Sequence, residues 1–277
     1  MQTTTQAQSQ AGRIRPWPEN PHFWQYHGEP VWLLGGTVKD NLFQIPDLEA
    51  HLDLLLAAGG NYIRNTMSDR PDQGFEIKAY ARDDAGRYDL TRWNEVYWQR
   101  FARMLQLTAA RGIIVQIELW DRFDHSQANW QADPFHPKNN VNYSHETSLL
   151  AAEYPDHPGA NRQPFFYTVP DLQDNRIVLD FQHAFIEKVL SISLPFDHVL
   201  YCMDNETSGD PAWGRYWAYY VRERAARAGV EVHMTEMWDN WDVRHETHRP
   251  TFDHAELYTF VDIAQNSHNP GETNWDR

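Results

Sequence analysis

The sequence is poor in cysteine, in basic residues and in long apolar runs. Its one cysteine, Cys202, has no partner for an internal disulfide, and its place inside an apolar stretch indicates a buried thiol. Acidic residues outnumber basic ones by 39 to 24, which gives a formal charge of -15. Nucleic acid and anionic membrane surfaces need clustered Lys and Arg, so we expect neither as a partner. No apolar run is long enough to span a bilayer.

The start of the chain also lacks an apolar segment. Residues 1–12 are mostly Gln, Thr, Ser and Ala, which is typical of neither a signal peptide nor an anchor, and we expect residues 1–19 to form a disordered leader. The compartment stays open, because a processed chain keeps no signal. A single α/β barrel takes about 250 residues. We therefore assign residues 20–277 to one barrel-type catalytic domain.

A junction between helix and strand recurs along the chain. Residues 57–60, 110–113 and 227–230 each end a predicted helix with glycine and begin an apolar strand at once. Glycine supplies the positive φ of a helix end, and the repetition predicts βα units around a parallel sheet. After a hairpin over residues 20–30, the predicted strands cover residues 31–37, 61–66, 113–121, 199–203, 230–239 and 257–263.

These six strands predict a (β/α)8 barrel of the TIM type that is incomplete at its carboxyl end, because eight strands are needed for closure. Residues 272–276 look like the start of another helix. The predicted helices cover residues 93–110 and 177–194, a leucine-rich segment around 48–56, and a segment that begins with Pro211 after the capping residue Asp210. Residues 80–90 are predicted to be a loop.

The segment 122–176 has no sustained periodicity and is rich in His, Asn, Pro and aromatic residues. Loops of this length are usually functional or disordered. The aromatic residues, among the 12 Trp, 13 Tyr and 13 Phe of the chain, favour an ordered cover over a site. Because the segment follows a predicted strand, we expect it at the carboxyl ends of the strands.

The stretch with the clearest chemistry is the end of the fourth strand. An apolar run over residues 199–203 stops at Asp204, Asn205 and Glu206, and a helix start follows. Ligands of α/β proteins bind on such strand-to-helix loops, where a carboxylate beside an amide is a candidate acid/base with its orienting partner. The alternative is that Asp204 and Glu206 only decorate a helix N-terminus, which the helix dipole favours.

An Asn-Glu pair at the end of strand four, after three βα units, resembles the clan A retaining glycoside hydrolases, the cellulase-like (β/α)8 enzymes. The resemblance implies that Glu206 is the acid/base of a double displacement, and that Asn205 hydrogen-bonds the 2-hydroxyl of the sugar. Arg64, at the end of the second strand, matches the arginine that many members place beneath the nucleophile. The nucleophile of the family ends strand seven, which has no counterpart in this chain.

Other candidate residues lie near the predicted strand ends. Glu236, at the end of the fifth strand, is a second carboxylate that could act as nucleophile at about 5 to 5.5 Å from Glu206, although a sugar contact is the preferred role. Trp120 and Trp238 offer stacking surfaces for sugar rings, or else pack in the core at the top of the barrel. The remaining predicted substrate contacts are Asp121, His233 and Tyr258.

Two other functions stay open. A metal-dependent hydrolase would use histidines such as His125, His245 and His248, although their segments show no helical pattern that would set them on one face, so we expect no metal and no cofactor. A carbohydrate-binding barrel with a degenerate site would keep the sugar contacts without turnover. In both the glycosidase and the binding protein the expected partner is a carbohydrate.

Overall fold

The computed structural model of this chain describes residues 12–263. Its centre is a four-stranded parallel sheet in the order β4-β7-β8-β9. The strands are β4 (Tyr62–Thr66), β7 (Ile114–Asp121), β8 (Val199–Asn205) and β9 (Met234–Thr235). Every residue of β7 and β8 is buried, as expected of parallel strands that are covered on both faces.

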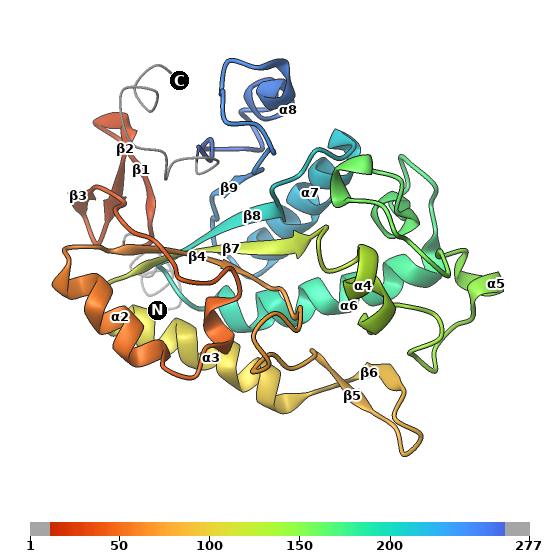
Figure 1. Cartoon of the computed structure of the whole chain (residues 1–277). Helices are drawn as coiled ribbons and strands as arrows, with labels where there is room; N and C mark the ends of the chain where they lie inside the picture. Colours follow the sequence, from red (N-terminus) through yellow and green to blue (C-terminus); the bar gives the residue numbers. More distant parts are fainter. Residues whose placement is uncertain (1–11, 264–277) are drawn as a thin grey trace.

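Four longer helices flank the sheet (Figure 1). They are α2 (Leu48–Ala57), α3 (Glu95–Ala109), α6 (Arg176–Ser193) and α7 (Pro211–Arg227). Asp210 caps α7 by accepting a hydrogen bond from the N–H of Ala212 at 2.9 Å, as predicted. Gly59, Gly112 and Gly229 follow α2, α3 and α7 with φ of 84°, 64° and 73°. The predicted helix-glycine-strand junctions are confirmed after α2 and α3, where a strand starts within two or three residues of the glycine, whereas after Gly229 the next strand begins only at Met234.

A small antiparallel sheet lies at the amino ends of the parallel strands. It contains β1 (Arg15–Trp17), β2 (Asn20–Tyr26) and β3 (Glu29–Val31). Ile14 packs in a cluster with Ile114, the first residue of β7, and Leu200, the second residue of β8. The predicted disordered leader is thus wrong over residues 12–19, because a buried Ile14 and the pairing of β1 with β2 fix this part of the chain. Residues 1–11 lie outside the described part.

Three predicted strands are shorter than the sequence suggested. Residues 31–37 contribute the end of β3 and one parallel bridge between Gly35 and Tyr62. Residues 230–239 form the two-residue β9 and one parallel bridge between Trp238 and Thr207. Residues 257–263 form no strand. The fold is thus an open part of a parallel α/β sheet in the described residues, with four paired strands where we predicted six.

The predicted loop at 80–90 is wrong in part. It contains an antiparallel hairpin of β5 (Tyr80–Arg82) and β6 (Tyr88–Trp93), in which Tyr80 stacks on Trp93 with ring centroids 5.1 Å apart. The predicted helix at 272–276 falls outside the described residues. None of the helices between residues 12 and 263 has the length and apolar character that crossing a bilayer requires.

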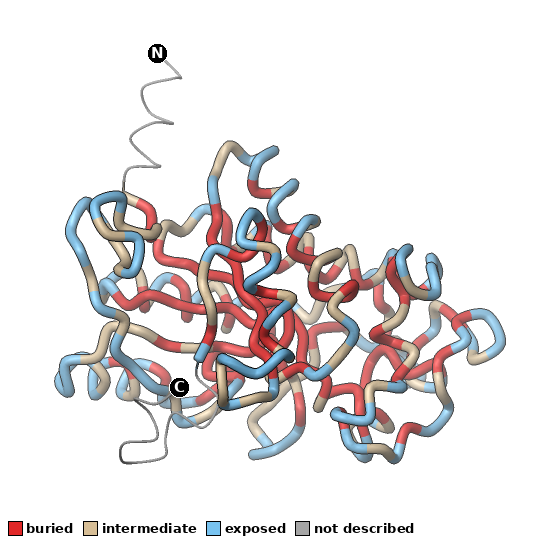
Figure 2. The backbone as a smooth tube through the Cα atoms, turned by 90° about the horizontal axis from the view of Figure 1, so that it is seen from above, coloured by how far each residue is buried: buried red, intermediate tan, exposed pale blue. Residues whose placement is uncertain are grey.

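The long segment after β7 is an ordered cover, as predicted. Its regular pieces are α4 (Gln127–Ala132), α5 (His145–Ser148), η2 (Pro158–Ala160) and η3 (Pro164–Tyr167). Trp130, Phe165 and Phe166 are almost fully buried. In Figure 2 the buried positions continue from the sheet into the lobe on the right, where this segment lies. We refer to residues 122–175 as the cover.

Two short elements follow β9. They are η4 (Glu246–His248) and α8 (Arg249–Phe252), and Figure 1 shows α8 at the top of the view, above β9.

Candidate active site

A largely buried ion pair joins Arg64, in the middle of β4, to Glu118 in the second half of β7. Arg64 Nε donates to Glu118 Oε1 at 2.6 Å, and Thr66 Oγ donates to Glu118 Oε2 at 2.5 Å. Glu118 is completely buried, whereas the side chain of Arg64 keeps 22% of its exposure. A buried carboxylate needs such partners, because an unpaired charge in the interior is costly. Arg64 is thus held in place with part of its guanidinium open to solvent.

Arg64 also fixes the amide at the end of β8. Its Nη2 donates to Asn205 Oδ1 at 3.0 Å, so the amide nitrogen of Asn205 turns to the other side, where it lies 3.4 Å from Asp121 Oδ2. The structure therefore brings together three residues that we predicted at the site, Arg64, Asp121 and Asn205. We call Arg64, Glu118 and Asn205 the inner cluster.

A second arginine extends this network to the rim. Arg70 Nη1 is hydrogen-bonded to Asp121, and its Nη2 lies 3.0 Å from Asp40 Oδ2. The side chain of Asp40 is 53% exposed, so the carboxylate stands at the mouth of the site. Arg70 itself is largely buried, and it holds a rim carboxylate and a buried carboxylate at once.

Glu206 follows Asn205 with φ of 45°, in the left-handed region that side chains with a Cβ seldom adopt. Its side chain is half-buried, and burial raises its pKa above the ordinary value. Arg64 acts in the opposite direction, while the negative charges of Asp40, Asp239 and Glu118 raise the pKa further. A carboxyl that keeps its proton closer to neutral pH is suited to act as a general acid.

The outward side of the same strand end carries another arginine and two more carboxyls. Arg122 Nε donates to Asp204 Oδ2 at 2.7 Å, and Glu236 Oε1 accepts a hydrogen bond from the N–H of Asp204 at 2.8 Å. All three residues are buried. We call Arg122, Asp204 and Glu236 the outer cluster. Burial and the neighbouring Asp204 raise the pKa of Glu236 well above its usual range.

Glu236 is enclosed within the outer cluster. A methyl group added to Gly214, which is part of α7, would stand 1.9 Å from Glu236 Oε2. The carboxyl is therefore pressed against the helix layer and is 2% exposed. The structure does not bring Glu236 into the inner cluster, so we do not retain it as nucleophile or sugar contact.

The remaining predicted substrate contacts are buried elsewhere. Trp120 packs against Phe185 at 5.4 Å and Trp217 at 5.3 Å between ring centroids, which corresponds to the core alternative. Trp238 is also buried, and its indole N–H donates to Thr251 at 2.8 Å.

His233 and Tyr258 are buried as well. His233 lies before the first residue of β9, at the amino end of the strand, where its ring meets Trp24 at 5.9 Å. Tyr258 lies beside Glu236 and Gly214 in the helix layer. Neither residue is exposed at the inner cluster, so their predicted role as sugar contacts is not supported by their positions.

Sequence reasoning missed Glu118, Arg70, Arg122 and Asp40. Glu118 has a recognisable pattern, because it lies with Gln116 at alternate positions in an otherwise apolar strand. Arg70, Arg122 and Asp40 lie in segments without periodicity, and only the folded chain shows their partners.

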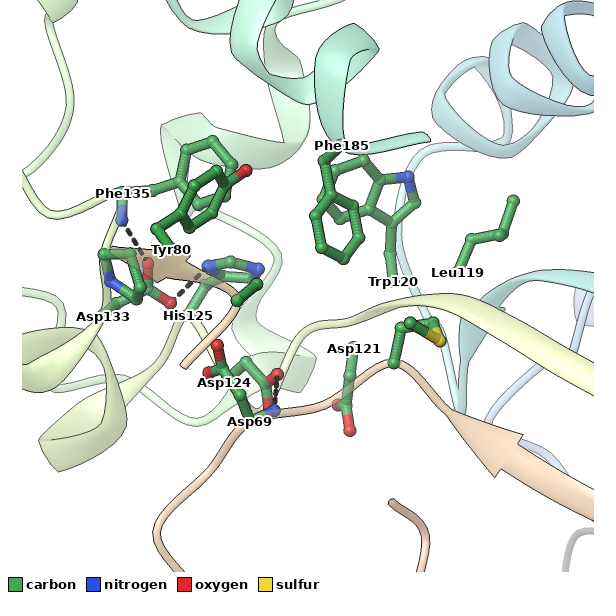
Figure 3. Close-up of a pocket in the computed structure, with 13 residues that line it drawn as sticks. Asp69, Tyr80, Leu119, Trp120, Asp121, Asp124, His125, Asp133, Phe135 and Phe185 are labelled. Atoms are coloured by element: carbon green, nitrogen blue, oxygen red, sulfur yellow. Dashed lines mark hydrogen bonds and ion pairs between the residues drawn. The ribbon is translucent and has the colours of Figure 1, made fainter. Parts of the chain in front are cut away.

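A small cavity between β7 and the cover lies beside the site (Figure 3). It measures about 30 Å³, close to the volume of one water molecule, so a sugar ring does not fit. Its polar wall is paired internally: His125 lies 2.9 Å from Asp133, and Ser68 donates to Asp124 at 2.6 Å. We therefore interpret this cavity as a packing gap between β7 and the cover.

A metal-dependent hydrolase would need several ligand side chains around one point. Within residues 12–263 no group of three or more His, Cys, Asp or Glu side chains is placed to hold a metal ion. His248 is buried with Nε2 2.9 Å from the carbonyl oxygen of Asn240, and His245 pairs with Thr247.

Comparison with known proteins shows the fold. No protein-family model and no curated protein match the sequence. A glycoside hydrolase family 5 mannosidase from Rhizomucor miehei, a mutant in complex with mannosyl-fructose, has a TM-score of 0.59 at 12% identity, over 96% of this chain and 63% of that one. An endo-1,4-beta-mannanase from the same organism has a TM-score of 0.54 at 12% identity, over 84% of this chain and 63% of that one.

This chain therefore spans less than two thirds of these proteins. The matches confirm, for the fold, the predicted resemblance to clan A glycoside hydrolases, whose (β/α)8 barrel accounts for the parallel sheet.

Proposed function

We propose that this protein is a glycoside hydrolase in which Glu206 is the acid/base of a retaining mechanism. The observation that carries the proposal is the position of Glu206, half-buried at the carboxyl end of β8 beside an amide that Arg64 fixes in orientation. The raised pKa of Glu206 keeps a proton available for the leaving oxygen, and the same carboxylate then removes a proton from water.

In this proposal Arg64 orients the amide of Asn205 toward the sugar. Because Asn205 Oδ1 accepts from Arg64, the amide N–H groups point away from Arg64, and one of them is left for the 2-hydroxyl of a sugar. We assign the role of substrate contact to Arg64 and Asn205. Asp121, whose side chain is 1% exposed and paired with Arg70, holds the amide nitrogen of Asn205 instead. The matched mannosidase and mannanase make β-mannosides the first substrates to test.

The second carboxylate of a retaining mechanism is not assigned between residues 12 and 263. Glu118 is paired with Arg64 and Thr66, and Glu236 is enclosed under α7.

The test is hydrolysis of 4-nitrophenyl glycosides and mannan by the full-length protein and by Glu206→Gln. The variant keeps the size of the side chain but has no proton to donate, so kcat/KM should fall by about 100-fold or more. Glu153→Gln, in an exposed part of the cover, is the matched control and should retain wild-type activity. Unchanged turnover by Glu206→Gln would defeat the assignment.

A carbohydrate-binding barrel without turnover is the second candidate. Glu236 is enclosed, so the described residues offer no second carboxylate that could act as nucleophile. This favours a protein that binds a carbohydrate without hydrolysing it. Mannan binding by a wild-type protein that hydrolyses none of the substrates would establish this alternative.

A further inference from the structure

Hydrogen bonds hold the turn that carries Glu206 on both sides. Asp204 precedes the pair Asn205 and Glu206, and Thr207 follows it. Arg122 Nε donates to both flanking residues, to Asp204 Oδ2 at 2.7 Å and to Thr207 Oγ at 2.8 Å. One buried N–H group thus spans the two residues at the centre of the proposed site.

The backbone on the far side of Glu206 is held as well. The N–H of Thr207 donates to the carbonyl oxygen of Met237 at 2.8 Å, and the N–H of Asp239 donates to the carbonyl oxygen of Thr207 at 2.7 Å. Glu206 keeps φ of 45° between these anchors. A non-glycine residue holds a left-handed conformation only where its surroundings enforce it.

The space around Arg122 shows that its position is tightly defined. A methyl group added to Gly209 would lie 2.0 Å from Arg122 Nη2, and the guanidinium sits 4.1 Å from the ring centroid of Phe166 in the cover. Only 4% of the Arg122 side chain is exposed, so it has no access to a substrate. Its guanidinium is enclosed by the turn on one side and by the cover on the other.

We propose that Arg122 is a positioning residue, which through Asp204 and Thr207 holds the Asn205–Glu206 turn in the conformation that aims the Glu206 carboxyl at the leaving oxygen. This inference rests on the proposed function for its catalytic consequence. Its conformational part stands on the hydrogen bonds alone. The cover takes part, because Phe166 closes over the guanidinium.

Two variants break the connection without leaving a buried carboxylate unpaired. Thr207→Val removes the hydroxyl acceptor at nearly constant shape, and Arg122→Lys keeps the positive charge but loses the fixed geometry of the guanidinium. Arg13→Lys is the matched control, because Arg13 is also buried and donates to two carbonyl oxygens, at the opposite end of the strands.

The first measurement compares two leaving groups in the full-length protein. Hydrolysis of phenyl β-mannoside needs protonation of the leaving oxygen, whereas 2,4-dinitrophenolate leaves without it. We expect both variants to lose about 10- to 100-fold in kcat/KM with the phenyl substrate and only a few-fold with the dinitrophenyl substrate. Equal losses on both substrates, as a general loss of folded protein would give, would overturn the proposal.

The second measurement needs no turnover. Amide hydrogen exchange at Thr207 and Asp239 should become at least about 10-fold faster in both variants, while the amides of β7 keep their rates. In Arg13→Lys, only amides close to residue 13 should change. Unchanged exchange at Thr207 and Asp239 would overturn the proposal. A wild-type protein that hydrolyses no glycoside but shows the faster exchange would refute the proposed function and leave the positioning by Arg122 supported.

Discussion

The inner cluster and the outer cluster lie at the same strand end and contain the same kinds of groups. Each pairs one arginine with a buried carboxylate, Arg64 with Glu118 at 2.6 Å and Arg122 with Asp204 at 2.7 Å. They differ in access, because the side chain of Arg64 is 22% exposed and that of Arg122 only 4%. The same kind of ion pair is therefore open to water in the inner cluster and sealed from it in the outer cluster.

The difference has a simple origin. Consecutive residues of a strand point to opposite faces, so Asn205 turns toward Arg64 and Asp204 toward α7 and the cover. A closed helix layer covers the second face. Charges sealed under it cannot meet a sugar, but they can fix the backbone that carries Glu206.

The largest expected effect comes from removing each arginine. Arg122→Met leaves Asp204 and Glu236 without a cation and should lower the free energy of unfolding by about 3 to 5 kcal/mol. Arg64→Met should cost less, because water reaches that side of the pair. Urea denaturation measures both. A larger loss for Arg64→Met would contradict the distinction between an open and a sealed cluster.

A smaller effect tests how tightly the outer cluster is packed. Gly214→Ala places a methyl group 1.9 Å from Glu236 Oε2, and we expect a loss of about 1 to 3 kcal/mol in the free energy of unfolding. Gly36→Ala, with no atom within 4 Å of the added methyl group, is the control and should stay near wild type. A neutral Gly214→Ala would show that Glu236 moves freely in its enclosure.

The pH dependence of stability offers a third test. The pKa of Glu236 is raised in the folded state, so the folded protein holds this proton more tightly and its stability falls as pH rises above the ordinary pKa of a glutamic acid. Glu236→Gln lacks this dependence. The stability of the wild type relative to the variant should fall by up to about 1.4 kcal/mol per pH unit, measured by urea denaturation between pH 5 and 8. A constant difference would show that Glu236 is ionised throughout.

The smallest expected effect is a change in the pKa of Glu206 when Asp40 is replaced. Asp40 raises the pKa of Glu206 through its negative charge, so Asp40→Asn should lower that pKa. Because the acid must be protonated for the first step, the alkaline limb of the kcat/KM profile should then move to lower pH. The pH profile of aryl glycoside hydrolysis measures this shift, with Asp72→Asn, another partner of Arg70, as the control. A shift to higher pH would contradict the placement of Asp40 beside Glu206.

Parts of the fold follow from local patterns. The glycines that end α2, α3 and α7, the cap at Asp210 and the apolar runs of β7 and β8 depend on neighbours in the chain, and all of them form as predicted. The strand predictions at 230–239 and 257–263 failed wholly or in part. An apolar segment becomes a strand only where a neighbouring strand pairs with it, and the sequence does not show where that happens.

The end of the buried strand at Asn205 and Glu206 is predictable from the sequence, because apolar residues change to acidic ones over a few consecutive positions. Which carboxylates lie on the same face is visible only in the folded chain. Glu118 joins Arg64 across 54 positions, while Glu236 joins Asp204 on the other side across 32. The direction of a side chain depends on strand register and on the layer above it, and no local pattern contains either.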